Sequence, residues 1–219
     1  MTILLLLLSL PLLLTLLYIS VSWLVSYPYH LQMIARYPFK KDAAGIETLA
    51  EAVTYLHGLN LSGWELVEKA QKLVAAKMEY SRRNSWDTPE QAFRRGMGYC
   101  LQQAEALKLI LDQFQIQSRL VQSSKNLFPP QRIHEYQTRG GLCGHAWLEV
   151  TLGNETKFVC PGNLQNQPGE IHFQILGRVT AYRGFFKFLG HCGSALLNTY
   201  WDQQATPRAP QTRPSPKSH

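Results

Sequence analysis

The amino-acid sequence predicts an α+β fold preceded by one apolar helix long enough to cross a membrane. Apolar residues recur every three or four positions over much of residues 44–114, which is the period of an amphipathic helix. Between residues 117 and 183 the pattern changes to alternation, which is typical of strands. Helices followed by a run of antiparallel strands define the α+β class. We therefore expect one globular domain with appendages.

The composition excludes a disordered chain and gives little support to a nucleic-acid partner. The chain has 219 residues, of which 45% are apolar and 17% are charged, so it can form a buried core. Its formal net charge is +7, but residues 203–219 contribute three basic residues and no acidic one. Residues 1–202 carry 19 basic against 15 acidic residues, or +4, without a basic stripe. We therefore expect no nucleic acid among the partners.

Residues 3–25 are predicted to anchor the protein in a membrane. They are almost entirely apolar, and the first formally charged side chain of the protein is Arg36. As a helix this segment would be about 35 Å long, enough for a hydrocarbon core of about 30 Å. Aromatic side chains are expected to form a belt at one interface: Tyr18, Trp23, Tyr27 and Tyr29.

A cleaved signal peptide is the alternative interpretation of the N-terminal segment. Residues 20–22 (SVS) weakly match a cleavage site, but no basic residue precedes the apolar stretch, which is also long for a signal peptide. If the segment is an uncleaved anchor, the positive-inside rule places the globular domain in the cytoplasm, because the basic residues Arg36, Lys40 and Lys41 follow the segment.

The predicted organisation is an anchor over residues 1–30, a linker over 31–43, a domain over 44–202 and a disordered basic tail over 203–219. Within the domain, the sequence predicts helices and strands in turn. The helices are expected at 44–57, 62–80 (from a Ser62-x-x-Glu65 capping box), 89–96 (with Thr88 as N-cap), 99–114 and 184–201. The strands are expected at 117–122, 145–152, 157–160 and 171–183, with a long polar loop over 123–143.

Cys100 is the first candidate for a catalytic residue. It lies in the first turn of the helix predicted over 99–114, directly after the glycine-rich break Gly96-Met-Gly98. The N-terminus of a helix lowers the pKa of a thiol, and its free N–H groups can bind a developing oxyanion. The alternative is a small buried hydrophobic residue. The four cysteines have no CxxC spacing, so neither a zinc site nor a disulfide framework is indicated.

His145 opens a predicted strand and could act as the base for Cys100. An imidazole that takes the thiol proton and returns it to the leaving amine is what thiol acyl chemistry requires. We expect the two side chains to lie within about 4 Å of each other.

Three segments resemble the core of the transglutaminase-like superfamily. They are GMGYCLQQAEAL at 96–107, IQSRLV at 116–121 and GHAWLEV at 144–150. The resemblance covers about residues 60–162. It implies a papain-like fold with a Cys-His-Asp triad, acyl transfer through a thioester on Cys100, and His145 as base and acid.

The sequence departs from this family at the third triad position, where Cys160 replaces the aspartate. If the hairpin turn pairs Gly153 with Thr156, Cys160 lies across from Glu149 and on the face of His145. A neutral thiol is a weak acceptor and stabilises an imidazolium poorly. Asn163 or Asn166 could orient the imidazole instead. A weakened enzyme and a pseudoenzyme both remain open.

The expected function is therefore that of a membrane-anchored thiol protein that acts on amide bonds in a protein or peptide substrate, by acyl transfer or hydrolysis. The alternatives are a non-catalytic binding module that keeps the cleft, and a structural membrane protein held by a metal or a disulfide. The residues for a metal would be Cys100, Cys143, His145 and Cys160, and Cys143 or Cys192 could form a disulfide. No cofactor or metal is expected. Structural or exposed roles are expected for His134, His172 and His191.

Overall fold

The protein is an α+β structure with one long N-terminal helix, as the sequence predicts. A computed structural model describes residues 2–42, 44–133, 136–138 and 140–204. Its helices are α1 (Thr2–Arg36), α2 (Leu49–Gly58), α3 (Gly63–Lys77), α4 (Pro89–Arg95), α5 (Cys100–Gln113) and α6 (Gly184–Gln204). Its strands are β1 (Glu79–Tyr80), β2 (Met97–Gly98), β3 (Gln117–Phe128), β4 (Gln131–Ile133), β5 (Tyr136–Thr138), β6 (Gly141–Leu152), β7 (Glu155–Val159), β8 (Gln174–Ile175) and β9 (Thr180–Ala181).

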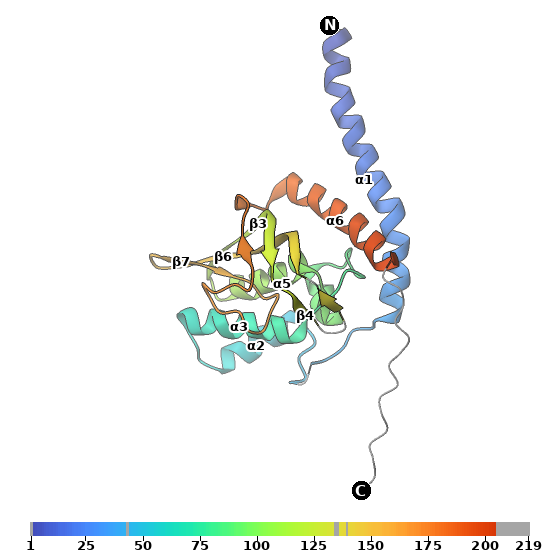
Figure 1. Ribbon diagram of the computed structural model, residues 1–219. Coiled ribbons are helices and arrows are strands. Elements are labelled where there is room, and N and C mark those ends of the chain that lie inside the picture. The colour runs from blue at the N-terminus through green and yellow to red at the C-terminus, as the bar shows by residue number, and fades with distance from the viewer. Residues whose placement is uncertain (1, 43, 134–135, 139, 205–219) are drawn as a thin grey trace.

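The main sheet is antiparallel and runs in the order β7-β6-β3-β8, with the short strand β9 also paired to β3. Helices α2, α3 and α5 lie on one side of this sheet, and α6 lies across the top of the domain beside α1 (Figure 1). Two smaller pairs, β1-β2 and β4-β5, lie outside it.

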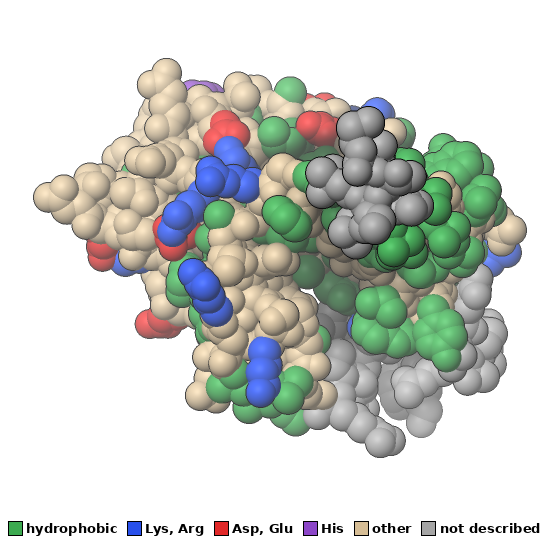
Figure 2. Space-filling model, turned by 90° about the horizontal axis from the view of Figure 1, so that it is seen from above, with side chains coloured by type: hydrophobic (Ala, Val, Ile, Leu, Met, Phe, Trp, Pro, Cys, Tyr) green, Lys and Arg blue, Asp and Glu red, His purple; other side chains and the backbone are tan. Residues whose placement is uncertain are grey.

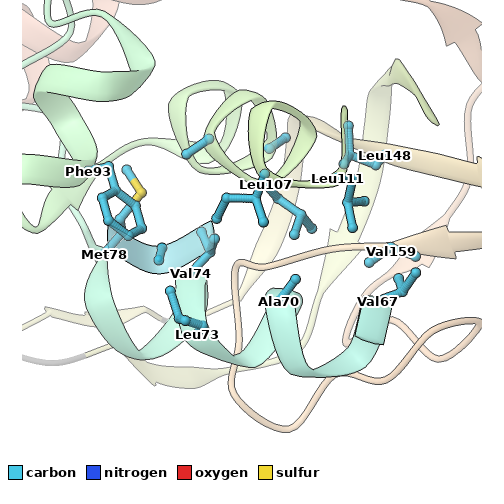
Figure 3. Packing of buried hydrophobic residues seen from close by; sticks show 14 of the residues in the cluster. Val67, Ala70, Leu73, Val74, Met78, Phe93, Leu107, Leu111, Leu148 and Val159 are labelled. Atoms are coloured by element: carbon cyan, nitrogen blue, oxygen red, sulfur yellow. The ribbon is translucent and has the colours of Figure 1, made fainter. Parts of the chain in front are cut away.

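The core lies between α3, α5 and the sheet. Figure 3 shows side chains of α3 pointing toward Leu107 and Leu111 of α5, with Leu148 and Val159 of the sheet closing the end of the layer. Leu107 and Leu111 are fully buried. Helix α5 is therefore the central element of the domain.

A second apolar cluster covers the other face of the sheet. Trp147 of β6 is fully buried there with Val121, Cys160 and Phe173. The sequence predicts that His145 and Trp147 lie on the polar face of a half-buried strand. The structure differs because the segment after β7 folds back over this face and removes it from water.

Helix α1 is the helix of the described residues that is long and apolar enough to cross a membrane. Its first part projects from the domain, and its second part packs along α6 (Figure 1). A buried stripe faces the domain: Ser22, Ser26, His30 and Met33. The helix continues to Arg36, so six residues of the predicted linker are helical. The predicted tail over 203–219 lies outside the described residues, except for Gln203 and Gln204 at the end of α6.

Tyr18 and Tyr29 of the predicted aromatic belt bind α6. The Tyr18 hydroxyl donates to the Leu189 carbonyl over 3.0 Å, and the Tyr29 hydroxyl donates to the Asp202 carboxylate. These two tyrosines therefore hold α1 to the domain.

Three details of the predicted helices differ from the structure: the cap of α3, the end of α3 and the start of α2. The Ser62 side chain makes no capping hydrogen bond, so the predicted capping box is not formed, and α3 ends at Lys77 rather than near residue 80. Helix α2 begins at Leu49 rather than 44, because Thr48 and Glu51 form a capping box there. The predicted N-cap at Thr88 with Pro89 in the first turn is confirmed.

The predicted polar loop over 123–143 is wrong. Strand β3 continues to Phe128 and pairs with the first residues of β6, from Gly141 to Cys143. Leu127 and Leu142 of this outer part are exposed, whereas Phe128 packs against the second apolar cluster, so the sequence shows no apolar alternation that would predict a strand here. The predicted strand over 171–183 is reduced to β8 and β9, two residues each.

The predicted register of the β6-β7 hairpin is wrong by two positions. Leu152 pairs with Glu155, so Gly153 and Asn154 alone form the turn, with Gly153 at a φ of 58°. Leu148 then pairs with Val159, so Cys160 lies level with Trp147, two residues closer to His145 than the expected position across from Glu149. Because side chains in a strand alternate, a two-residue shift keeps Cys160 on the face of His145.

We predict that Leu107→Ala destabilises the domain by about 2–5 kcal/mol, because removing a fully buried leucine leaves a cavity in a close-packed layer. Urea unfolding of the full-length protein in detergent measures the loss. The matched control is Leu164→Ala, at a side chain that is 55% exposed, for which we expect a change below about 0.5 kcal/mol. Equal effects of the two substitutions would contradict the central position of α5.

Candidate active site

A cleft of about 220 Å³ opens between the start of α5, the start of β6 and the loop after β7. Cys100 and His145, the two residues predicted to act together, both line it. The other lining residues are Tyr80, Arg82, Gln103, Phe128, Gly140, Gly141, Leu142, Cys143, Gly144, Gly162 and His172. Among these, Arg82 is the side chain with a permanent formal charge.

The break before α5 places Cys100 at the cleft. Gly96 ends α4 in the left-handed region, at a φ of 72°, and the next two residues form β2. Tyr99 is the N-cap of α5, and the Gln102 side chain accepts a hydrogen bond from its N–H over 3.1 Å. The Cys100 thiol is half-buried in the first turn that follows.

The expected lowering of the Cys100 pKa is wrong in direction. Burial raises the pKa of the Cys100 thiol to about 11. Hydrogen bonds from the backbone N–H groups of Ala146 and Leu101 act in the opposite direction and are outweighed. The helix N-terminus therefore supplies donors to the sulfur without making it a thiolate at neutral pH.

A β-bulge in β3 positions His145. His145 pairs with Ser123, but the next pair, Cys143 with Asn126, is reached only after one extra residue in β3. The Asn126 amide donates to the carbonyls of Ser123 and Cys143, at 2.8 and 3.2 Å, and satisfies backbone groups that the bulge leaves without ladder partners. The bulge thus interrupts the regular ladder next to the imidazole.

His145 Nε2 contacts Cys160 Sγ at 3.3 Å. Nδ1 is then the ring nitrogen that remains for Cys100 or a substrate. In the tautomer that leaves Nδ1 free to accept a proton, Nε2 carries the hydrogen and donates to the sulfur. In the described part of the chain, no hydrogen bond joins Cys100 to His145, so the expected 4 Å contact remains a prediction.

Cys160 is buried beside the imidazole of His145, and hydrogen bonds to its backbone hold it in place. Its side chain is 1% exposed, and its carbonyl accepts hydrogen bonds from the Gln71 and Asn166 amides, at 3.0 and 2.8 Å. Burial raises the pKa of the thiol to about 12, although the backbone N–H of Gly162 lowers it. Cys160 therefore contacts His145 as a neutral group.

His172 is the site residue that the sequence interpretation missed. Its ring lies 6.4 Å from the His145 ring, and its Nδ1 hydrogen-bonds the Asn166 side chain at 2.9–3.1 Å. Asn166 thus orients His172 and not His145, and Asn163 accepts from the Gln165 N–H instead. In the described structure, neither expected substitute for the triad acid forms a hydrogen bond with the imidazole of His145. No motif surrounds His172 within the strand predicted over 171–183, so the sequence gave no signal of a role at the site.

Aromatic rings enclose His145. Phe128 and Phe173 meet it edge to face, with ring centroids 5.1 and 4.7 Å away, and Trp147 stacks at 6.0 Å. This burial, followed by the nearby His172, lowers the pKa of His145 to about 3. Burial also lowers the pKa of His172 to about 4. Both imidazoles are therefore neutral at pH 7, and no carboxylate of the described residues opposes the shift of His145.

Gln103 offers the cleft a hydrogen-bond acceptor. Its Nε2 donates to the Met78 carbonyl over 2.8 Å, which fixes the orientation of the amide. Its Oε1 is buried and, among the described residues, has no hydrogen-bond partner. A substrate N–H group in the cleft could satisfy it.

The remaining cysteines and histidines lie in different surroundings. All four cysteines are free, with Cys143 exposed at the cleft and Cys192 buried on α6. His191 bonds the Tyr99 hydroxyl at 2.6 Å. His134 lies outside the described residues. No group of three or more ligand side chains among the described residues is arranged to hold a metal ion.

Comparison with known proteins adds no relative: no family model matches the chain, and no curated protein is similar to it at a significant level.

We predict that Cys100 alkylation by iodoacetamide is slow at neutral pH and accelerates about tenfold per pH unit toward pH 11. The thiolate is the reactive form, and with a pKa of about 11 its fraction at pH 7 is on the order of 10⁻⁴. Peptide mass spectrometry separates Cys100 from the exposed Cys143 in the same sample. A rate plateau below pH 8 would show a preformed thiolate–imidazolium pair and contradict the neutral site.

Proposed function

We propose that the protein is a membrane-anchored, transglutaminase-like thiol enzyme that acts on amide bonds of proteins or peptides. The observation that carries this proposal is the shared cleft, in which Cys100 at a helix start and His145 on a strand flank one space, with the His145 ring fixed from behind by Cys160. Helix α1 supports the anchor, and the basic residues that follow it favour a cytoplasmic domain.

The proposed chemistry starts from a neutral pair. Cys100 Sγ attacks the carbonyl carbon of the substrate amide while its proton passes to His145 Nδ1. The backbone N–H groups at the start of α5 stabilise the negative oxygen. His145 then gives its proton to the leaving nitrogen, the C–N bond breaks, and an acyl thioester remains on Cys100. Water or an amine attacks the thioester and regenerates the thiol.

The third position sets the rate in this scheme. When His145 accepts the proton it becomes an imidazolium inside an aromatic enclosure, with a neutral thiol at Nε2. The charge is poorly stabilised, so we expect turnover several orders of magnitude below that of a triad with aspartate, by analogy with the roughly 10⁴-fold loss on replacing the aspartate of a serine protease triad.

A non-catalytic binding module is the second candidate. The pKa of about 11 for Cys100 and the absence of a carboxylate at His145 among the described residues both favour it. Arg82 and the Gln103 amide oxygen would then serve as binding groups for a peptide in the same cleft.

Covalent trapping distinguishes the two candidates. We expect the full-length protein, incubated with glutamine-containing peptides, to gain an acyl adduct on Cys100 that hydroxylamine removes. Cys100→Ala should abolish the adduct, and His145→Asn should slow it by about 10²–10⁴-fold. The control Cys192→Ala removes a buried thiol of α6 outside the cleft and should leave the adduct unchanged. Peptide binding without any adduct would establish the binding module.

We predict that Cys160→Asp lowers the pKa of Cys100 and accelerates adduct formation. A carboxylate at this position can accept from His145 Nε2–H and from the Gly162 N–H, which already lies against the sulfur. It would raise the pKa of His145 and favour proton transfer from the thiol. The isosteric control is Cys160→Asn, which lacks the charge.

The pH dependence of Cys100 alkylation measures the effect in both variants. A folded Cys160→Asp protein whose thiol pKa equals that of Cys160→Asn would refute the assignment of Cys160 to the triad position.

A further inference from the structure

The start of α6 lies beside the middle of α1. Helix α6 runs in the same direction as α1, since Leu189 bonds Tyr18 near one end of the contact and Asp202 bonds Tyr29 near the other. Figure 1 shows α6 along the top of the domain, on the side from which α1 projects. The first turns of α6 are thus the part of the domain nearest the projecting apolar segment.

The lipid-facing surface of α1 continues past this level. Residues that follow Tyr18 in α1 are apolar and exposed: Val21 (42%), Trp23 (48%), Leu24 (64%) and Val25 (50%). A bilayer that covers these side chains also reaches the level at which Leu189 contacts Tyr18. The start of α6 would then lie in the interfacial region of the same membrane.

The side chains at the start of α6 suit this position. Phe185, Phe186 and Phe188 are 56%, 80% and 42% exposed, and Arg183 and Lys187 lie among them in the sequence. Aromatic residues interleaved with basic ones are typical of segments that enter the boundary between headgroups and acyl chains. Figure 2, which views this face from above, shows hydrophobic side chains gathered around the projecting helix and Lys and Arg side chains beyond them.

We propose that the aromatic end of α6, residues 184–189, inserts into the interface of the phospholipid bilayer that holds α1. This inference rests on the proposed membrane anchor. It assigns the domain a second contact with lipid, made by side chains that nothing else in the described structure covers.

This contact fixes the candidate active site relative to the membrane. His191 of α6 bonds the Tyr99 hydroxyl at 2.6 Å, and Lys187 pairs with Glu105 of α5 at 2.5 Å. Helix α6 therefore joins the bilayer on one side to the helix that carries Cys100 on the other. A cleft held in this way would meet substrates that lie at the membrane surface.

Fluorescence quenching by lipid tests the proposal. The full-length Phe186→Trp protein is reconstituted in phosphatidylcholine/phosphatidylglycerol vesicles, with or without brominated acyl chains. Its spectrum is compared with that of the wild-type protein, because the native chain contains five tryptophans. We expect the added emission to shift to the blue and to lose most of its intensity in brominated vesicles. The control is Leu59→Trp, 37% exposed at the end of α2 and on the opposite side of the domain (Figure 1), whose emission should not respond.

Three results would overturn the proposal. In the first, acrylamide quenches the added emission from position 186 and brominated lipid does not. This result would show that the start of α6 is exposed to water, and it would leave the anchor intact. Emission protected from both quenchers would indicate a protein partner instead of lipid. A protein that does not float with vesicles and is released by carbonate would refute the anchor as well.

Discussion

The burial of α5 is the constraint on which the rest of the structure depends. Ala104, Leu107, Ile110 and Leu111 are all fully buried between the other helices and the sheet. A helix packed on this many sides cannot shift or rotate without opening cavities in the core. Its first turn is therefore fixed, and with it the sulfur of Cys100. The strands that bring His145 and Cys160 to the same place pack against the same helix, so the core determines the geometry of the cleft.

Burial at the cleft also disfavours the charged forms of His145 and Cys100. Aromatic rings around His145 exclude water, and this lowers the pKa of the imidazole to about 3 while the thiol pKa of Cys100 rises to about 11. An enclosed imidazole usually needs a nearby negative charge to become an imidazolium. Cys160 has the position for that charge and lacks the chemistry. In the mechanism we propose, the proton would therefore pass between two neutral groups, and its transfer would be costly at the transition state.

The sequence predicted the features that depend on local patterns. The helical period, the cap at Thr88 and the helix start at Cys100 are local, and the structure confirms them. The hairpin register was missed because it depends on how Gly153 and Asn154 turn, and a two-residue slip satisfies the same alternation. Long-range packing decided the rest. The sign of the Cys100 pKa shift depends on burial by segments distant in sequence. His172 reaches the cleft from the loop between β7 and β8, and no sequence motif marks it.

Helix α1 is packed into the domain rather than joined to it by a flexible tether. Arg95 donates to the Ile34 and Tyr37 carbonyls at the C-terminal end of α1, and the buried Asp87 carboxylate holds the guanidinium at 2.7 Å. A cation at this end of a helix is favoured by the helix dipole, and the carboxylate offsets the cost of burying it. Trp86, in the segment that joins α3 to α4, donates to Ser26 about two turns earlier in α1, at 2.8 Å. Helix α4 and the segment before it therefore bind α1 at two heights. Two contacts at different heights prevent rocking as well as sliding. A membrane that fixes the tilt of α1 therefore also fixes the direction in which the cleft opens.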